Sequence, residues 1–465
     1  MKIRKHAAIL LAWLPFAAAA QTPACSCPDV LEQTVDKVTR IYAGYFDKVN
    51  DRTRPRYERL LDSLRRQAPR AKQPAACNAL LQTYQNFFRD RHVKVYFTQR
   101  ADRSQVRRLP ITETRLKANL QNPAYRADLA EGIWTTGDGN NRFLITKDPK
   151  KPGTLVAVWL SGNYRNWQPG TVMAELKTNE EVVYNVTVFN DDASSYQLPL
   201  RLTENGLVFK GFSWKREYPQ AFTAAQRQQL KERAPVRLRP VNDDFVYLRL
   251  SAFNQSEVDE LDGLIKANAD LINRTPNLIL DLRGNGGGDA SPSFTMMELL
   301  YDQPMPIPTD SYRASAEMMA QAQTYDTVLA NRLKTNPGGL VPYSPFPLLT
   351  LDKISISPKR VAILMDKGCA SSTEFLLYLT RYSRKTTLFG TNSMGVMDYG
   401  QQKDFRLNCP DFTLSIPVTR SGWVDTEPID NVGFKPHVRI PAGTKDWVPF
   451  VVNHWKTKPV PTAQR

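Results

Sequence analysis

Between Pro28 and Asp90, apolar residues recur at intervals of three and four positions, the spacing of one face of an α-helix. Basic, proline-containing stretches around Pro55 and between Pro69 and Pro74 interrupt this pattern. We therefore predict an N-terminal bundle of three helices within residues 21–92. The apolar positions are Leu31, Val35, Val38, Ile41 and Tyr42, then Leu60, Leu61 and Leu64, then Leu80, Leu81, Tyr84 and Phe88.

The pattern changes between residues 93 and 240, where short β-rich runs are separated by Gly, Asn and Asp turns. Several short antiparallel strands in one block predict an inserted sheet or small barrel that folds on its own. Trp134, Trp159 and Trp167 are expected to pack inside it. The runs are residues 142–146, 155–160, 182–189, 198–202 and 207–212.

Strands alternate with helices between residues 241 and 450, which predicts an α/β core. Ser256 and Asp259 have the spacing of a capping pair at the start of a helix. The proline-rich stretch 304–347 is expected to be a long surface excursion, and residues 451–465 a C-terminal tail. The expected strands are 245–250, 278–282, 361–365 and a short one near Leu388, and a helix is expected over 372–382.

The first twenty residues have the pattern of a secretory signal peptide: Lys2, Arg4 and Lys5 precede the apolar run Ala7 to Ala20. We therefore predict an exported protein, periplasmic or extracellular, with no transmembrane segment after signal removal. Export permits disulfides. Five cysteines allow either Cys25 or Cys27 to pair with Cys77 and Cys369 to pair with Cys409, with one thiol left over, and the sequence leaves the connectivity open.

The net charge is +16 for the full sequence and +13 once Lys2, Arg4 and Lys5 leave with the signal peptide, a balance that favours acidic partners such as peptides or envelope polymers. The basic residues are scattered and match no nucleic-acid module. With four histidines and no CxxC or HExxH spacing, we expect neither a metal nor another cofactor. Oligomeric state is left open by the sequence.

Two segments carry candidate chemistry. Residues 280–288 have the sequence Leu-Asp-Leu-Arg-Gly-Asn-Gly-Gly-Gly, so a buried strand runs into a loop whose amides are able to bind developing negative charge. Residues 366–375 have the sequence Asp-Lys-Gly-Cys-Ala-Ser-Ser-Thr-Glu-Phe, so a strand, a tight bend and a helix follow one another. A serine at that bend lies at the positive end of the helix dipole.

Together these segments resemble the signature pair of the tail-specific (C-terminal processing) serine peptidases and the related tricorn proteases. The resemblance implies a crotonase-like (Clp-like) α/β core. It also implies Ser371 as nucleophile, three residues before Glu374, and an oxyanion hole formed by the amides of Ser372 and of Gly286 or Gly287.

The resemblance is closer to the branch of the family that uses Ser, His and an acid. The lysine of the Ser-Lys branch is replaced by Val396. In the tricorn-like branch the base lies in an Asp-x-His stretch, which implies His92. The acid lies in a stretch that corresponds to residues 430–437, which implies Asp430, with Glu427 as the fallback.

The sequence therefore predicts a serine endopeptidase that cleaves peptides or proteins through an acyl-enzyme. Two alternatives remain. One is an inactive protein on the same core that binds a peptide or an apolar ligand. The other is an α/β-hydrolase esterase using His437 or His454, although no Gly-x-Ser-x-Gly elbow is present.

Overall fold

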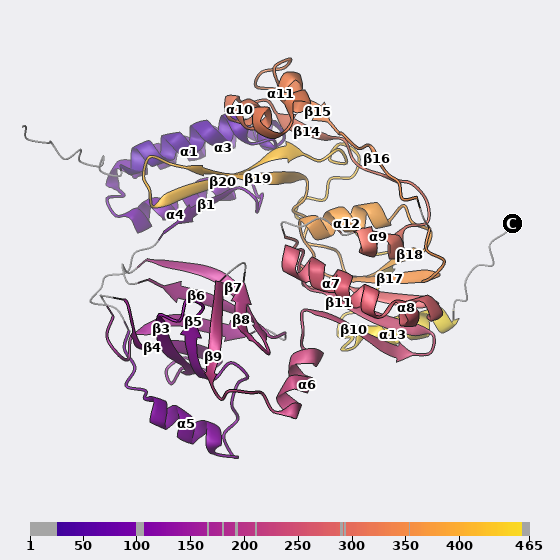
Figure 1. Ribbon diagram of the computed structural model, residues 1–465. Coiled ribbons are helices and arrows are strands. Elements are labelled where there is room, and N and C mark those ends of the chain that lie inside the picture. The colour runs from indigo at the N-terminus through magenta and orange to yellow at the C-terminus, as the bar shows by residue number, and fades with distance from the viewer. Residues whose placement is uncertain are drawn as a thin grey trace, which may run out of the picture.

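The computed structural model shows three parts: a helical layer on a sheet, a β-barrel, and an α/β core (Figure 1). The predicted signal peptide lies outside the described residues. The structure describes residues 26–98, 107–164, 167–178, 181–190, 194–209, 212–288, 292, 294–352 and 354–457.

The core is built on a six-stranded sheet in which all neighbouring strands are parallel except the first pair. This confirms the predicted α/β class. In spatial order the strands are β10 (Val236–Asn242), β11 (Phe245–Leu250), β12 (Asn277–Asp281), β17 (Arg360–Met365), β18 (Thr386–Gly390) and β21 (Val438–Arg439).

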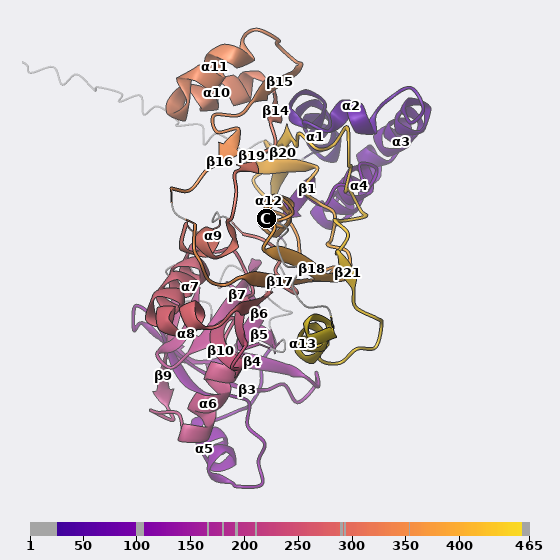
Figure 2. The same ribbon diagram turned by 90° about the vertical axis from the view of Figure 1, so that its right-hand side faces the viewer.

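Helices cover both faces of this sheet, because its central strands are apolar on both sides. Figure 2 shows α13 on one side and α7 and α8 on the other. Four helices pack on the first face: α7 (Gln255–Ala267), α8 (Ala269–Arg274), α9 (Phe294–Leu300) and α12 (Ser372–Thr380). Asn254, rather than Ser256, is the N-cap of α7.

The second face is covered by α13 (Trp447–Thr457), whose Val451, Val452 and Trp455 are buried. The predicted tail from residue 451 is therefore a packed helix as far as Thr457. Its apolar face packs against Phe245 and Phe389 of the sheet.

The predicted β-rich domain is a closed barrel of eight antiparallel strands, flanked by α5 (Glu113–Gln121) and α6 (Ala224–Glu232). Trp134, Trp159 and Trp167 are buried in its apolar cluster, which confirms their packing role. The strands are β2 (Gly132–Thr136), β3 (Asn141–Lys147), β4 (Thr154–Gly162), β5 (Val172–Thr178), β6 (Val183–Phe189), β7 (Ser195–Thr203), β8 (Gly206–Phe209) and β9 (Phe212–Tyr218).

The predicted helical bundle is present, and it packs on a second sheet that the sequence analysis did not predict. The helices are α1 (Cys27–Ile41), α2 (Tyr45–Lys48), α3 (Arg54–Gln67) and α4 (Pro74–Asn86), with a 3₁₀ turn, η1 (Ala68–Arg70). The sheet contains β1 (Lys94–Phe97), β14 (Asp310–Arg313), β15 (Leu340–Tyr343), β19 (Tyr399–Arg406) and β20 (Phe412–Arg420).

The stretch 304–347 is therefore not a simple surface excursion, and that prediction is wrong. It supplies β14 and β15 to the second sheet, and its helices α10 (Ala316–Tyr325) and α11 (Thr327–Leu333) bury Met318, Leu329 and Leu333 in the same apolar cluster as the bundle. A short ladder of β13 (Met305–Pro306) and β16 (Leu348–Leu349) flanks it.

Cys27 and Cys77 form a disulfide that joins α1 to α4, which is one of the two pairings expected for Cys77. Cys369 is a buried free thiol, and Cys409 is disulfide-bonded. The Cys369–Cys409 pairing that the sequence allowed is therefore not formed. Cys369 instead lies within the loop after β17, where its Sγ donates to the Leu282 carbonyl oxygen at 3.1 Å.

Candidate active site

Four loops gather at the carboxyl ends of the parallel strands β11, β12, β17 and β18. This edge is where open α/β sheets bind ligands, because successive loops converge there. The loops are residues 251–254, 282–288, 366–371 and 391–396. Both sequence-predicted motifs therefore lie at the same edge of the sheet.

Ser371 lies at the turn between β17 and α12, with φ 56° and ψ −123°. A non-glycine residue rarely adopts this conformation, which costs on the order of 1–3 kcal/mol and is found mainly at functional sites. The Ser371 hydroxyl forms no hydrogen bond to any other described residue. The turn thus presents a strained, half-buried serine at the N-terminus of a helix, as in a nucleophile elbow.

The glycine loop packs directly against this serine. Gly287 has φ +87°, and a Cβ atom added there would lie 2.8 Å from Ser371 Cβ and 2.9 Å from the Ser372 nitrogen. The Ser372 hydroxyl donates to the Gly288 carbonyl at 2.8 Å. The structure therefore brings the predicted oxyanion segment and the predicted nucleophile together.

The amides of this region are not equally available. The Gly287 amide donates to Asn285 Oδ1 at 3.0 Å. Within the described part of the chain, no acceptor is found for the backbone amides of Ser372 and Gly286. Two of the three predicted oxyanion donors are therefore unengaged by protein groups.

Asn285 is a residue that the sequence reasoning missed. It is fully buried, its side-chain amide donates to the Leu250 carbonyl at 3.1 Å, and its Oδ1 also accepts from Thr373 Oγ1 at 2.8 Å. Its own carbonyl accepts from the Ala370 amide at 3.0 Å. One side chain thus ties β11, the glycine loop and the first turn of α12 together. The sequence feature that pointed to Asn285 was its position within the glycine motif.

Glu374 was used in the sequence analysis only to locate Ser371, but it also organises the loop after β18. Its buried carboxylate accepts from the Ser393 hydroxyl at 2.5 Å and from the amides of Gly395 and Val396 at 2.7 and 2.9 Å. Burial raises the pKa of Glu374, and these hydrogen bonds oppose the rise. Val396, at the position of the lysine in the other branch, is buried beside it.

His92 lies between α4 and β1, and its ring is fixed by a backbone carbonyl. Its Nδ1 lies 2.7 Å from the Tyr399 oxygen, and its backbone amide donates to Asp90 Oδ1 at 2.8 Å. Because a carbonyl oxygen only accepts, Nδ1 carries the proton and Nε2 is the basic nitrogen. The Tyr42 hydroxyl donates to the other Asp90 oxygen at 2.8 Å.

Asp430 has a different principal partner from the predicted one. Its carboxylate forms an ion pair with Lys48 of α2, and its amide donates to Asp398 Oδ2 at 2.9 Å. Burial raises the pKa of Asp430, and Lys48 partly opposes the rise. The fallback acid Glu427 is paired with Arg381 at 2.8 Å. Neither acid is hydrogen-bonded to His92 in the described structure.

Short contacts nevertheless connect the segments that carry Ser371, His92 and Asp430. Arg91 reaches the Met394 sulfur at 3.2 Å, and the Met394 amide donates to the Cys369 carbonyl at 2.8 Å. Asn431 Nδ2 donates to the Arg89 carbonyl at 2.8 Å. No hydrogen bond joins Ser371 to His92 within the described residues. Catalytic hydrogen bonds are often long in unliganded enzymes and tighten when substrate binds.

The two C-terminal histidines lie elsewhere. His437 Nδ1 accepts from the Leu388 amide at 3.1 Å, within the sheet, and the His454 ring packs against Phe389 and Phe450. This placement disfavours the esterase alternative. Among the described residues, no cluster of His, Cys, Asp and Glu is suited to a metal ion, and no helix has the length and apolarity to cross a membrane.

A model of peptidase family S41 matches residues 244–440. The matched segment contains the parallel strands β11, β12, β17, β18 and β21, the glycine loop and Ser371. The α/β core is therefore similar to the domain that defines peptidase family S41, a family of serine-type peptidases. No curated protein matches the sequence.

Three solved structures illustrate what the whole chain is similar to. Mature CPAF is 13% identical, with a TM-score of 0.47 over 90% of this chain and 93% of that chain. The photosystem II D1 C-terminal processing protease is 14% identical, with a TM-score of 0.39 over 90% of this chain and 93% of that one. The tricorn protease is 14% identical, with a TM-score of 0.40 over 89% of this chain and 34% of its own.

Proposed function

We propose that the protein is an exported serine endopeptidase of the tail-specific type in which Ser371 is the nucleophile and His92 the general base. One observation carries this proposal: Ser371 is held in a strained backbone conformation at the start of α12, against the glycine loop. A serine with only a capping role has no need of that conformation, because N-cap residues normally lie in the extended region.

The chemistry is acyl transfer in two steps. His92 Nε2 takes the proton from Ser371 Oγ as that oxygen attacks the peptide carbonyl carbon. The amides of Ser372 and of the glycine loop, Gly286 or Gly287, stabilise the oxyanion. His92 then returns the proton to the leaving amine, and a water molecule activated by His92 hydrolyses the ester on Ser371.

The acid of the triad remains the proposed Asp430. Burial is the main cause that raises the pKa of Asp90 next to His92, and the charge of Asp430 adds to the rise, which supports a place for Asp430 near this region. The Tyr399 carbonyl holds the imidazole tautomer, and the Asp430 carboxylate stabilises the imidazolium through charge. This arrangement follows the tricorn-like branch, in which an acid supports the histidine.

Fluorophosphonate labelling and peptide cleavage test the proposal on the purified mature protein. We expect wild-type protein to label, and Ser371→Ala to lose labelling and at least about 10⁴-fold in kcat. His92→Ala should lose both to a similar degree. Matched controls are Ser161→Ala, on the exposed end of β4, and His454→Ala, on α13, which should label like wild type.

Retention of most activity in Ser371→Ala would contradict the proposal. Folded wild-type protein that neither labels nor cleaves would favour the alternative, a binding protein on the same core.

A further inference from the structure

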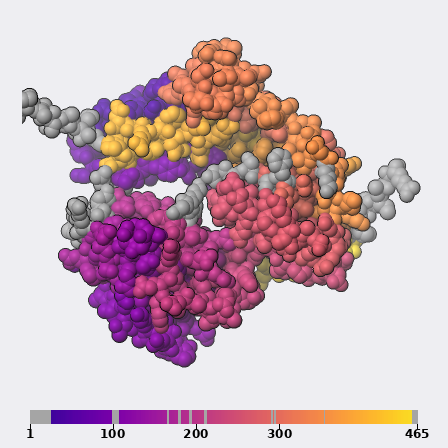
Figure 3. Space-filling view, viewed as in Figure 1, coloured from indigo at the N-terminus to yellow at the C-terminus, as the bar shows by residue number. Residues whose placement is uncertain are grey.

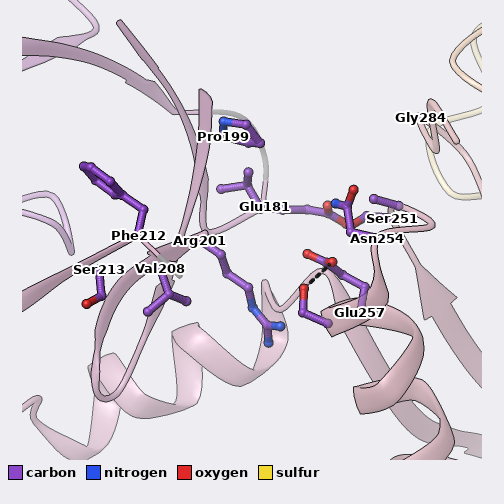
Figure 4. Close-up of a pocket in the computed structure, with 13 residues that line it drawn as sticks. Glu181, Pro199, Arg201, Val208, Phe212, Ser213, Ser251, Asn254, Glu257 and Gly284 are labelled. Carbon is purple, nitrogen blue, oxygen red and sulfur yellow. Dashed lines mark hydrogen bonds between the residues drawn. The ribbon is translucent and has the colours of Figure 1, made fainter. Parts of the chain in front are cut away.

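A pocket of about 520 Å³ lies between the barrel and the core (Figure 4). Its barrel wall contains four apolar side chains from strands β6 to β9, Val183, Pro199, Val208 and Phe212, together with Glu181, Arg201 and Ser213. Its core wall is polar and contains the loop after β11 and the first turn of α7, including Glu257. The pocket thus has the shape and lining of a site for a side chain with an apolar stem and a polar end.

The pocket adjoins the glycine loop that supports Ser371. Gly284 lines it, and the Phe253 amide, in the loop of its core wall, donates to the Gly287 carbonyl at 3.0 Å. A Cβ atom added at Gly288 would lie 2.2 Å from the Phe253 carbonyl oxygen. Because consecutive residues of an extended peptide are about 3.8 Å apart, a substrate residue near the scissile bond is able to reach it.

The other charged side chains of the pocket are neutralised by neighbours. Arg201 forms a two-point ion pair with Glu260, including a contact of 2.9 Å. Glu181 pairs with Arg249 at 2.9 Å. Glu181 also lies 3.4 Å from Arg237, so both of these charged side chains have ion-pair partners of their own.

Glu257 has no such partner. Within the described structure its carboxylate accepts one hydrogen bond, from the Ser256 hydroxyl at 2.8 Å, and it forms no ion pair. Figure 4 shows it on the core wall, facing the space between the two walls. Among the described lining residues, Glu257 is therefore a negative charge without an ion-pair partner, and it lies opposite a wall that includes apolar side chains.

We propose that this pocket is a subsite for a lysine or arginine side chain of the peptide substrate, with Glu257 as its counter-ion. The inference rests on the proposed peptidase function. The aliphatic stem packs on Val208 and Phe212, and the cationic end reaches Glu257, because long basic side chains bury their stems and keep the charge at the polar edge. A glutamate side chain at the same substrate position is repelled by the negative charge of Glu257.

The positive net charge of the whole protein, +16 for the full sequence, acts differently from this local contact. Scattered surface charges are screened over roughly 8–10 Å at physiological salt, whereas a partly buried pair is screened much less. The basic surface attracts acidic polypeptides at long range, and Glu257 selects one basic residue within them.

The test uses the purified mature protein and sets of fluorogenic peptides. Within a set, the peptides are identical except at one position, which holds lysine, arginine, norleucine or glutamate. One set is made for each position on either side of the cleaved bond. At one position, we expect kcat/KM for lysine or arginine to exceed that for norleucine by about tenfold or more. Glu257→Gln should remove this advantage while leaving the norleucine peptide within about twofold of wild type. Glu257→Lys should reverse the preference toward glutamate.

Glu298→Gln, on the exposed surface of α9, is the matched control and should keep the preference. Fluorophosphonate labelling of Ser371 is measured on every variant, because the small probe does not enter the subsite. If every variant labels normally and Glu257→Gln still prefers the basic peptides, this inference is overturned, while the proposed peptidase function stands. Wild-type protein that shows no basic preference at any position would do the same. Wild-type protein that neither labels nor cleaves would overturn the proposed function and this inference with it.

Discussion

At the scale of single residues, the site depends on a few buried polar side chains that hold loops rather than on a dense catalytic cluster. Asn285 joins three segments, and Glu374 holds the loop 393–396. Each side chain is buried with its hydrogen bonds satisfied, which such groups need in a low-dielectric interior. These residues act through Ser371 and the glycine loop, so they are positioning residues.

Asp90 gives a pH prediction at this scale. Burial is the main cause that raises its pKa from 3.8 to about 6. Between these values the unfolded chain has released the proton and the folded protein still holds it, so the free energy of unfolding falls as pH rises. We expect wild type to lose about 2.4 kcal/mol relative to Asp90→Asn between pH 4 and pH 7.

Urea denaturation of both proteins across this pH range measures the difference. Stability curves that stay parallel from pH 4 to pH 7 would show that Asp90 ionises in the folded protein as it does in the unfolded chain.

At the scale of secondary-structure elements, helices pack on both faces of the parallel sheet and hold in place the strands whose carboxyl ends carry the site. α12 places Ser371, and α13 supports the strands from behind. Trp455 of α13 packs on Phe245 and Phe389, and the Arg360 guanidinium lies 4.5 Å from its ring centre. A helix at the end of the chain is thus part of the core.

Trp455→Ala should therefore lower the free energy of unfolding by about 3–5 kcal/mol, because a large buried side chain leaves a cavity. Urea denaturation followed by circular dichroism measures it. The neighbouring exposed residue supplies the control, since Lys456→Ala should change stability by less than about 0.5 kcal/mol. Equal, small effects of both substitutions would mean that α13 does not contribute to the core in solution.

At the scale of the whole molecule, the barrel, the core and the helical layer surround an opening that the space-filling view shows (Figure 3). The barrel contacts the core through the ion pairs Arg201–Glu260 and Glu181–Arg249. The helical layer reaches the core through Lys48–Asp430 and through Arg91. The predicted triad therefore draws on two of the three parts, so its geometry depends on how they pack.

A double-mutant cycle on Arg201→Met and Glu260→Gln measures the contact between barrel and core. We expect a coupling energy of about 0.5–1 kcal/mol in urea denaturation, since both side chains are partly exposed. The same cycle on Arg65 and Glu32, a more exposed pair within the bundle, should give a smaller value. A coupling energy near zero for Arg201 and Glu260 would indicate that the barrel is not held on the core by this pair.

The sequence by itself determined the features that depend on local spacing: the helical bundle, the barrel strands, the α/β alternation, and the strand–loop and strand–turn–helix motifs at Gly287 and Ser371. Local spacing sets which residues share a face and where the chain bends, so such features are readable without a fold. Only the tertiary structure decided the partners of His92 and Asp430, the second sheet, the free Cys369 and the pocket at Glu257. Lys48 and Asp430 are separated by 382 positions, and His92 and Tyr399 by 307. Contacts at such separations follow from how whole elements pack, and no local pattern records them.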